Sequence, residues 1–375
     1  MNPDSALVAL SASLNGEGPA VEILPGTTNN EYLVSLVAEA DVEGLEEIAA
    51  VVRTSGSTGT PKRTALSVEA LASSSMATAE YLGFEGQWLL ALPLHYVAGL
   101  SVLSRSLYAG TRPWAMDLDR SFDAAGFNEA ASALTDRKRL VSLVPTQLQR
   151  LLTDPDGETL STLKRFDAIL LGGARAPRSV LEAAARHSLN IHLTYGSSET
   201  SGGCVYDAKP LPGVEVKAVD GRIWLGGPTI ASGYLGDPEL TAKHFSVDGE
   251  GTRWYRTDDL GGYEDGVLTV GGRADDVIVT GGVKVSASRI QQVIESLPGV
   301  GSVMVLPVAH EQWGQQVGAA LSGTADPESV REAVRSALGA AAVPRRILQL
   351  PALPLLPNGK FDRMALGALL AAAPE

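Results

Sequence analysis

Short apolar runs alternate with segments of helical periodicity from residue 49 to residue 194, and this alternation constrains the fold more than any other feature of the chain. The pattern predicts strands at residues 49–53, 88–92, 140–144, 168–171 and 191–194, and helices at 68–81, 100–108, 122–134, 146–152 and 178–187. Repeated strand–helix–strand order is typical of a largely parallel sheet with helices on its faces. We therefore expect an α/β fold here.

The pattern changes twice after this region. Residues 213–272 contain short alternating strands and many glycines, which indicates a smaller β-rich subdomain. From residue 276, strand-like segments at 277–280, 303–307 and 317–321 alternate with helical segments at 287–297 and 328–338. A chain of 375 residues is too long for one ordinary domain. We place the boundary at residues 272–276, which predicts a large N-terminal domain over residues 1–273 and a small α+β C-terminal domain over residues 274–375.

Composition excludes several classes of function. The formal net charge of −13 argues against general nucleic-acid binding and against binding to anionic membranes, although a local loop can still bind a small anion. Cys204 is the single cysteine, so an internal disulfide is excluded and a reducing compartment is expected. The N-terminus lacks a signal-peptide pattern, and no apolar run is long enough to span a bilayer. We expect a cytoplasmic protein without membrane insertion.

A loop rich in glycine and hydroxyl groups follows the first predicted strand of the alternating region. It consists of Thr54, Ser55, Gly56, Ser57, Thr58, Gly59, Thr60, Pro61 and Lys62. Glycines let backbone N–H groups approach a phosphate, hydroxyls add donors and the lysine adds a positive charge. A Walker A loop is excluded, because Pro61 stands where its second glycine belongs and Arg63 where its Mg²⁺-binding hydroxyl belongs. The alternative is a flexible linker, which the preceding strand disfavours.

Four later segments also carry groups that suit a nucleotide site: residues 195–200, 254–261, 272–276 and 357–360. The first places Glu199 at the end of a predicted strand, where open α/β sheets bind ligands and where a carboxylate can hold Mg²⁺ on substrate phosphates. The second ends a predicted strand with Asp258 and Asp259, which suit ribose hydroxyls. A turn presents Lys360 near the C-terminus. Each segment taken singly has an ordinary alternative: a capping turn, a polar turn, a solvated linker or an exposed lysine.

The order and spacing of these segments resemble the adenylate-forming superfamily of acyl-CoA synthetases, adenylation domains and luciferases. Residues 54–62 look like its phosphate loop, and 171–174 look like its adenine-side glycine segment. Residues 195–199 are similar to its Tyr-Gly-x-Thr-Glu motif with Ser198 in place of Thr, and 255–259 to its Tyr-Arg-Thr-Gly-Asp motif with Asp258 in place of Gly. The resemblance covers residue 49 to the end. Because the phosphate loop comes so early in this sequence, we expect the usual N-terminal subdomain to be largely missing.

The resemblance implies a role for each matching position. ATP or AMP would contact the loop residues Thr54, Ser55, Gly56, Ser57, Thr58, Gly59 and Lys62, and also Gly172, Gly173, Ala174, Tyr195, Gly196, Ser198, Asp259 and Arg273. Glu199 would hold Mg²⁺, and Lys360, Glu199 and Lys62 would carry the catalysis. Asp275 would be the hinge of a mobile C-terminal domain. The co-substrates implied are ATP with Mg²⁺, a small-molecule carboxylate and coenzyme A.

Residues 92–101 give the best indication of the acyl substrate. They resemble the o-succinylbenzoate–CoA ligases of menaquinone synthesis, and residues 195–206, with Ser198 and a pair of glycines at 202 and 203, resemble the actinobacterial forms. The resemblance implies a pocket formed by His95, Tyr96, Gly99 and Ser197. The family often has an aromatic residue followed by His at the gate, whereas here His95 precedes Tyr96, so either residue can be the gate. o-Succinylbenzoate carries two carboxylates, of which only the succinyl carboxylate is activated. Arg105 is a candidate to bind the other one, with a surface ion pair as the alternative role.

Two other functions remain open from the sequence. One is another aryl- or acyl-CoA ligase of the same superfamily, and the other is an adenylate-binding protein that has lost catalysis. A homodimer is compatible with the sequence, which does not determine the oligomeric state.

Overall fold

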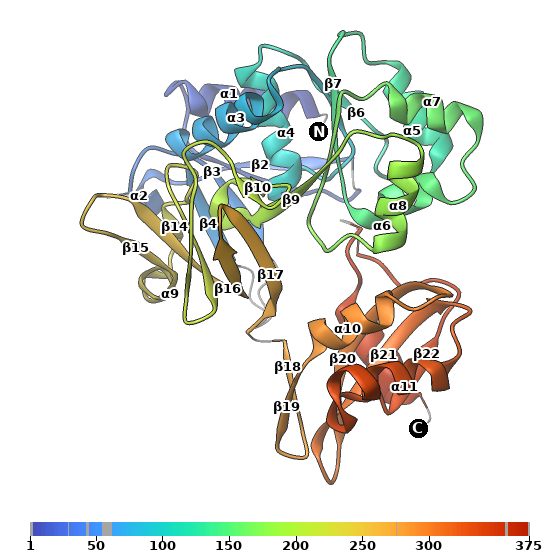
Figure 1. The fold of residues 1–375 in the computed structure, drawn as a ribbon. Helices are drawn as coiled ribbons and strands as arrows, with labels where there is room; N and C mark the ends of the chain where they lie inside the picture. The colour runs from blue at the N-terminus through green and yellow to red at the C-terminus, as the bar shows by residue number, and fades with distance from the viewer. Residues whose placement is uncertain are drawn as a thin grey trace.

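A computed structural model of the chain describes residues 3–28, 30–42, 45–54, 62–274, 276–356 and 359–373 (Figure 1). The N-terminal part contains two sheets with a layer of helices between them. The first sheet has the order β14-β4-β3-β1-β2 and consists of β1 (Val21–Pro25), β2 (Tyr32–Leu36), β3 (Ile48–Thr54), β4 (Lys62–Ser67) and β14 (Gly233–Tyr234). Within it, β1 is parallel to β3 and the other pairs are antiparallel.

The second sheet confirms the α/β prediction. Its order is β11-β10-β9-β8-β7-β5-β6, built from β5 (Gln87–Leu90), β6 (Trp114–Ala115), β7 (Arg139–Leu143), β8 (Ala168–Leu171), β9 (Ile191–Ser197), β10 (Gly202–Tyr206) and β11 (Lys209–Pro210). The five strands β6, β5, β7, β8 and β9 are parallel, and β10 and β11 add an antiparallel edge. The predicted strand at 49–53 exists as β3 but lies in the first sheet. Only residues 55–61 separate β3 from β4, which is too few for a parallel crossover connection.

Helices cover both faces of the second sheet. They are α1 (Pro3–Leu14), α3 (Val68–Leu82), α4 (Val97–Tyr108), α5 (Ala124–Ser132), α6 (Pro145–Leu152), α7 (Gly157–Lys164) and α8 (Arg178–Arg186), whereas the short α2 (Glu39–Val42) packs against the first sheet. Leu90 and Leu170 share a core with α1, α3, α4 and the first sheet, whereas Leu89 and Ile169 share a second core with α5 to α8. Neighbouring residues thus point to opposite faces, as strand geometry requires. The sequence did not predict α1, α7, β1, β2 or β4.

The predicted β-rich subdomain is an antiparallel sheet of order β12-β13-β16-β15, with β17 also paired to β16. Its elements are β12 (Glu215–Val219), β13 (Arg222–Gly226), β15 (Phe245–Val247), β16 (Arg253–Glu264) and β17 (Val267–Arg273), with α9 (Pro238–His244) alongside. One prediction is wrong in detail. Asp258 and Asp259 do not end a strand but lie in the middle of β16, because β17 returns along β16 and pairs with it from Asp259 to Glu264.

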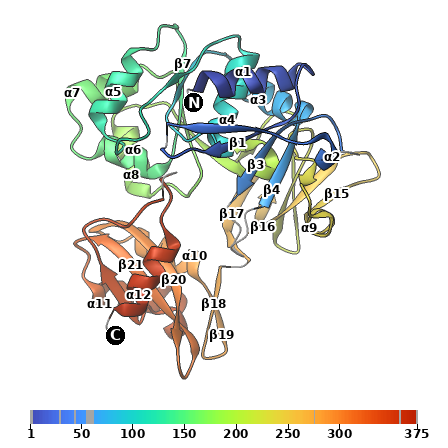
Figure 2. The ribbon, with the colours of Figure 1, turned by 180° about the vertical axis from the view of Figure 1, so that it is seen from behind.

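The C-terminal part has a sheet and a core of its own (Figures 1 and 2). It contains β18 (Val277–Thr280), β19 (Val283–Ser286), α10 (Ala287–Glu295), β20 (Val300–His310), β21 (Gly314–Gly323), α11 (Pro327–Leu338), η2 (Ala340–Ala342), β22 (Arg346–Gln349) and α12 (Arg363–Ala372). The strand β17, which ends at Arg273, belongs to the β-rich subdomain, whereas β18, which begins at Val277, belongs to the C-terminal sheet of order β19-β18-β21-β20. The domain boundary at 272–276 stays a prediction, and Asp275 lies outside the described residues.

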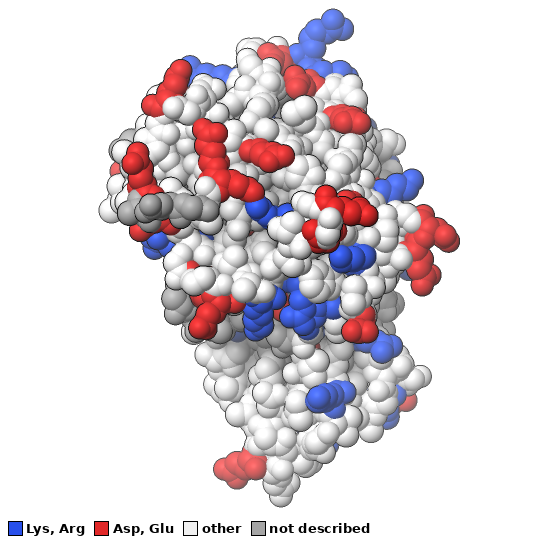
Figure 3. Space-filling view, turned by 90° about the vertical axis from the view of Figure 1, so that its left-hand side faces the viewer, with Lys and Arg blue, Asp and Glu red and all other residues white. Residues whose placement is uncertain are grey.

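Two further observations concern membrane-spanning helices and the charge of the surface. Among the described residues, no helix combines the length and the apolar character that a bilayer crossing requires. Figure 3 shows acidic and basic side chains interspersed on the face it presents.

Candidate active site

The loops that follow the parallel strands β7, β8 and β9 meet at one edge of the second sheet, and the predicted site residues gather there. Val144 follows β7, Gly172 and Gly173 follow β8, and Glu199 follows β9. The carboxyl edge of a parallel sheet is where open α/β folds bind ligands. The structure therefore brings together segments that lie far apart in the sequence.

The segment predicted to be a phosphate loop begins and ends on two paired strands. Thr54 at the end of β3 lies opposite Lys62 at the start of β4. Ser55, Gly56, Ser57, Thr58 and Gly59 lie outside the described residues. The Lys62 ammonium is 5.2 Å from the centre of the Tyr234 ring, within the range of a cation–π interaction.

A carboxylate that the sequence analysis missed connects the two strands on either side of this segment. Arg53 and Arg63 are directly opposite each other on β3 and β4, and both bind the buried Glu22 of β1, with Nε of Arg53 at 2.7 Å and Nη2 of Arg63 at 3.0 Å. Burial raises the pKa of Glu22, but the hydrogen bonds and charges of the two guanidinium groups lower it further, so its pKa lies below the usual value. The signal available was an acidic residue inside the apolar run of residues 20–24.

Glu199 is almost completely buried, with 6% of its surface exposed. It belongs to the short helix η1 (Ser198–Thr200), whose preceding residue Ser197 accepts a hydrogen bond from the Glu199 backbone N–H. Its Oε1 accepts a 2.8 Å hydrogen bond from the Tyr234 hydroxyl, and its other oxygen has no partner among the described residues. Gly196 belongs to β9, where a Cβ would lie 2.1 Å from the Gly202 carbonyl oxygen of β10, so only glycine fits this close approach.

The described residues contain no cluster of three or more acidic, histidine or cysteine groups that would hold a metal ion by themselves. Mg²⁺ commonly binds one or two carboxylates and takes its remaining ligands from substrate phosphates and water. A single buried carboxylate with one oxygen unpartnered among the described residues fits that kind of site, and Tyr234 connects it to Lys62 at the end of the predicted phosphate loop. The donor set therefore suits Mg²⁺ on a nucleotide.

A second group of polar residues lies at the β16–β17 pair. The Tyr195 hydroxyl donates to Asp259 Oδ2 at 2.7 Å, and Arg273, directly opposite Asp259 on β17, lies 3.8 Å from Asp259 Oδ1. Asp258 binds Arg222 at 3.1 Å, a partner that the sequence analysis missed. Burial first, and then the negative charge of Asp259, raise the pKa of Tyr195, so its hydroxyl remains a donor. The predicted ribose-binding residues are therefore adjacent.

Lys360 reaches this edge from the C-terminal part of the chain. The Thr146 hydroxyl at the start of α6 donates to the Gly359 carbonyl at 2.7 Å, and a Cβ built on Gly173 would lie 3.5 Å from Lys360 Cε. Gly173 has φ +79°, a conformation that favours glycine. The Lys360 residue keeps a large accessible surface, yet the protein atoms near its ammonium desolvate it and lower its pKa from the usual value. Ala174, the last residue of the glycine segment, is exposed.

Of the four predicted acyl-pocket residues, His95, Tyr96 and Gly99 lie at the start of α4, whereas Ser197 is the last residue of β9. The rings of His95 and Tyr96 are 4.2 Å apart, and Tyr32 of β2 lies 6.5 Å from His95. Burial lowers the pKa of His95, whose Nδ1 is buried without a partner among the described residues, and burial raises the pKa of Tyr96. At Gly99, a Cβ would lie 2.3 Å from the Pro93 carbonyl oxygen, so this glycine permits close packing of the first turn.

Arg105 is buried, with 7% of its surface exposed, so the surface ion pair weighed as its alternative role is wrong. Its Nη2 donates to the Tyr206 hydroxyl at 3.1 Å and its guanidinium lies 5.3 Å from the centre of the Trp88 ring. Its Nε has no hydrogen-bond partner, and no carboxylate among the described residues pairs with it. A buried cation without an anionic partner is costly unless a ligand supplies the anion.

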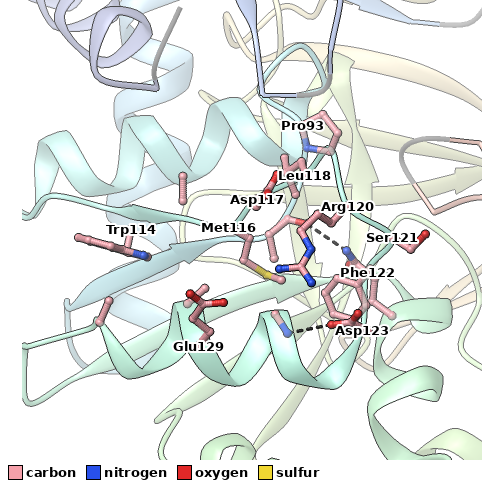
Figure 4. A pocket seen from close by; sticks show the side chains of 16 residues that line it. Pro93, Trp114, Met116, Asp117, Leu118, Arg120, Ser121, Phe122, Asp123 and Glu129 are labelled. Atoms are coloured by element: carbon pink, nitrogen blue, oxygen red, sulfur yellow. Dashed lines mark hydrogen bonds between the residues drawn. The ribbon is translucent and has the colours of Figure 1, made fainter.

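A separate cavity of about 520 Å³ lies between α5 and the ends of β5 and β6 (Figure 4). Apolar side chains such as Met116 and Phe122 line it together with the charged residues Arg120, Asp123 and Glu129. None of the predicted site residues lines this cavity.

Comparison with known proteins identifies the class. Residues 12–235 match the AMP-binding enzyme family, and residues 289–360 match the AMP-binding enzyme C-terminal domain. The chain belongs to the AMP-binding enzyme family.

Among its relatives, the probable 2-succinylbenzoate–CoA ligase of Mycobacterium tuberculosis is 40% identical, over 96% of this chain and 94% of the relative. The 2-succinylbenzoate–CoA ligase of Escherichia coli is 34% identical, over 85% of this chain and 68% of the relative. Two solved structures are also similar. ATP-bound MatB from Rhodopseudomonas palustris has a TM-score of 0.73 at 26% identity and covers 88% of this chain and 69% of that one. A variant of E. coli MenE with bound OSB-AMS has a TM-score of 0.70 at 29% identity, covering 91% and 72%.

Proposed function

We propose that this chain is an ATP-dependent, AMP-forming carboxylate–CoA ligase that converts o-succinylbenzoate into o-succinylbenzoyl-CoA for menaquinone biosynthesis. In the first step, the succinyl carboxylate attacks the α-phosphorus of ATP to give acyl-AMP and pyrophosphate. In the second, the CoA thiol attacks the acyl carbon and AMP leaves. Glu199 and the Lys360 segment lie at the carboxyl edge of the second sheet, and Asp259 of β16 is hydrogen-bonded to Tyr195 of β9. This grouping carries the proposal, together with relatives of this activity that share most of the chain's length.

The first step requires alignment and charge neutralisation more than covalent chemistry from the protein. Lys62 and the phosphate loop would hold the β- and γ-phosphates. Asp259 and Arg273 would bind the ribose, and Gly172 and Gly173 would line the adenine side. Glu199 would hold Mg²⁺, which when bound neutralises charge on the phosphates. Lys360 would bridge the oxygens of the carboxylate and the α-phosphate, since Gly173 and Val144 lie against its segment.

The second step needs CoA to reach an acyl-adenylate that the Lys360 segment covers. We assign residues 1–273 and 274–375 to two domains, with Asp275 as the hinge about which the smaller one rotates between steps. The change of sheet between β17 and β18 supports this division.

Arg105 is our candidate for the second carboxylate of o-succinylbenzoate. This carboxylate keeps its charge throughout the reaction, so a desolvated pocket must supply donors or a cation. Arg105 is buried without a carboxylate partner among the described residues, and its Nη2 lies 4.0 Å from a Cβ built on Gly202, beside the β9 residues of the site.

A carboxylate panel tests the substrate. We expect kcat/KM for o-succinylbenzoate to exceed that for benzoate and for medium-chain fatty acids by at least ~100-fold, the scale of an unpaired buried polar group. If benzoate or a fatty acid is preferred, the chain is another aryl- or acyl-CoA ligase of the family. If no carboxylate releases pyrophosphate from ATP, the chain is an adenylate-binding protein without catalysis, and the proposed function is wrong.

A further inference from the structure

One side chain touches both residues that the proposed function places at the phosphate end of the site. Tyr234 lies on β14 and is 5% exposed. Its hydroxyl donates to Glu199 Oε1 at 2.8 Å, and the face of its ring lies 5.2 Å from the Lys62 ammonium. Neither the phosphate-loop motif nor the Glu199 motif includes this residue, which is 35 positions from Glu199 along the chain.

The hydrogen bond fixes the orientation of a buried carboxylate. Among the described residues, no lysine, arginine or histidine forms an ion pair with Glu199, and Tyr234 is the only side chain that donates to its carboxylate. Because Oε1 accepts this bond, Oε2 remains for another ligand. The 2.8 Å separation between the Tyr234 hydroxyl and Oε1 is that of an ordinary hydrogen bond, with the hydroxyl as donor and the carboxylate as acceptor.

Tyr234 itself is held firmly. Its strand pairs with β4, where Tyr234 lies opposite Thr64, two residues beyond Lys62. Its backbone N–H donates to the Thr241 hydroxyl at 2.9 Å, and its ring packs edge-on against Phe245 with the ring centres 5.3 Å apart. The first contact fixes the backbone at this residue, and a rotation of the ring would break its packing against Phe245. The hydroxyl therefore provides a fixed point against which the Glu199 carboxylate is oriented.

We propose that Tyr234 is a positioning residue that holds the Glu199 carboxylate for a divalent cation and sets the Lys62 ammonium beside it. This inference rests on the proposed function. A carboxylate released from Tyr234 can rotate or recruit water, so its contribution to cation binding falls. The aromatic ring alone retains the contact with Lys62. The hydroxyl and the ring thus have separable roles: the first acts on the cation and the second on the phosphates.

The variant Tyr234→Phe removes the hydroxyl and keeps the ring. We expect the Mg²⁺ concentration for half-maximal ATP–pyrophosphate exchange to rise about tenfold, the size of one hydrogen bond to a charged group. Mn²⁺ binding in the presence of α,β-methylene-ATP, followed by electron paramagnetic resonance, should weaken by a similar factor. Thioester formation from supplied o-succinylbenzoyl-AMP should stay within about twofold, because that step consumes no ATP.

Tyr81→Phe is the matched control. The Tyr81 hydroxyl also donates to a carboxylate, Asp207 Oδ2 at 2.9 Å, but at a position outside the proposed site. This variant should leave the Mg²⁺ and Mn²⁺ dependence unchanged. Tyr234→Leu removes the ring as well, and should in addition raise the KM for ATP through the loss of the contact with Lys62.

Equal Mg²⁺ and Mn²⁺ dependence in wild type and a folded Tyr234→Phe variant would overturn the inference. If Tyr234→Phe melts early, the comparison is repeated in a Glu199→Gln background. Loss of the Tyr234→Phe effect there supports the inference, and an undiminished effect overturns it. Failure of the proposed function gives a different result. If the wild type exchanges no pyrophosphate, but binds Mn²⁺ with the analogue more tightly than Tyr234→Phe does, the inference about Tyr234 holds and the proposed ligase activity is wrong.

Discussion

The two ends of the candidate site are built differently. At the phosphate end, Glu199 and Tyr234 are each at most 6% exposed, and both belong to the N-terminal part of the chain. At the Lys360 end, the lysine comes from the C-terminal part and keeps a large accessible surface. Its segment joins the N-terminal part through the bond from Thr146 to the Gly359 carbonyl, and Ser302 adds a longer contact of 3.4 Å to Gln149.

This difference teaches how one site can serve two reactions. The phosphate end is held by contacts within one part of the chain, so we expect it to persist through the whole cycle. Each of the two hydrogen bonds named above contributes little net free energy. We therefore expect the Lys360 end to dissociate more readily than the phosphate end after adenylation. Changes at the Lys360 end should separate the two half-reactions from each other.

The largest expected effect is that of Lys360→Ala. A positive charge beside the α-phosphate contributes on the order of three decades of rate once bound substrates have displaced water from around it. We expect ATP–pyrophosphate exchange to fall by about that factor, whereas thioester formation from supplied acyl-adenylate is largely spared. Equal losses in the two half-reactions would contradict the difference between the two ends.

Asp275→Pro should have the opposite selectivity. Proline fixes φ near −65° and restricts the preceding residue, so it should trap one orientation of the C-terminal domain. We expect exchange within about tenfold of wild type and thioester formation reduced by more than ~100-fold. A thermal melt serves as the folding control. Little change in either half-reaction, or a parallel loss of both with a lowered Tm, would remove Asp275 from the role of hinge.

The two ends should also differ in pH dependence. Lys360 must be protonated to bridge the anionic oxygens, and the surrounding protein lowers its pKa. As pH rises through this lowered pKa, the cation is lost earlier than for an ordinary lysine, and adenylation should fall by up to about tenfold per pH unit. Thioester formation from supplied acyl-adenylate should show no matching fall. Lys360→Arg, which keeps its charge, should flatten the alkaline limb of the exchange profile, and an unchanged limb would assign it to another group.

The smallest expected effect concerns the contact that docks Lys360. Thr146→Val removes the hydroxyl that donates to Gly359, and one neutral hydrogen bond corresponds to roughly a threefold to tenfold loss. We expect that loss in adenylation alone. Thr153→Val is the control, because the Thr153 hydroxyl donates within the same helix region, to the Gln149 carbonyl at 2.8 Å. Equal losses in the two variants would show that Thr146 matters for α6 rather than for docking.

The sequence by itself determined the α/β class and the chemistry expected at several positions. Periodicity predicted β7, β8, α3 and α8 almost to the residue, because the local pattern of apolar side chains specifies these elements. The motifs located Glu199, Asp259 and Lys360 before any geometry was known. The roles of these residues stay predictions, and residues 55–59 of the loop lie outside the described part of the chain.

Only the tertiary structure decided which residues contact and support the predicted site residues. Glu22 under the phosphate hairpin, Tyr234 on Glu199 and Thr146 on Gly359 are contacts between residues 31 to 213 positions apart. The burial of Arg105 and the mid-strand position of Asp258 likewise follow from how β10 and β17 pack. A local sequence pattern indicates which face of a helix or strand is buried. The residues that pack against that face are determined by the topology of the chain. A hydroxyl or carboxylate therefore acquires its function only when a distant strand or helix is placed against it.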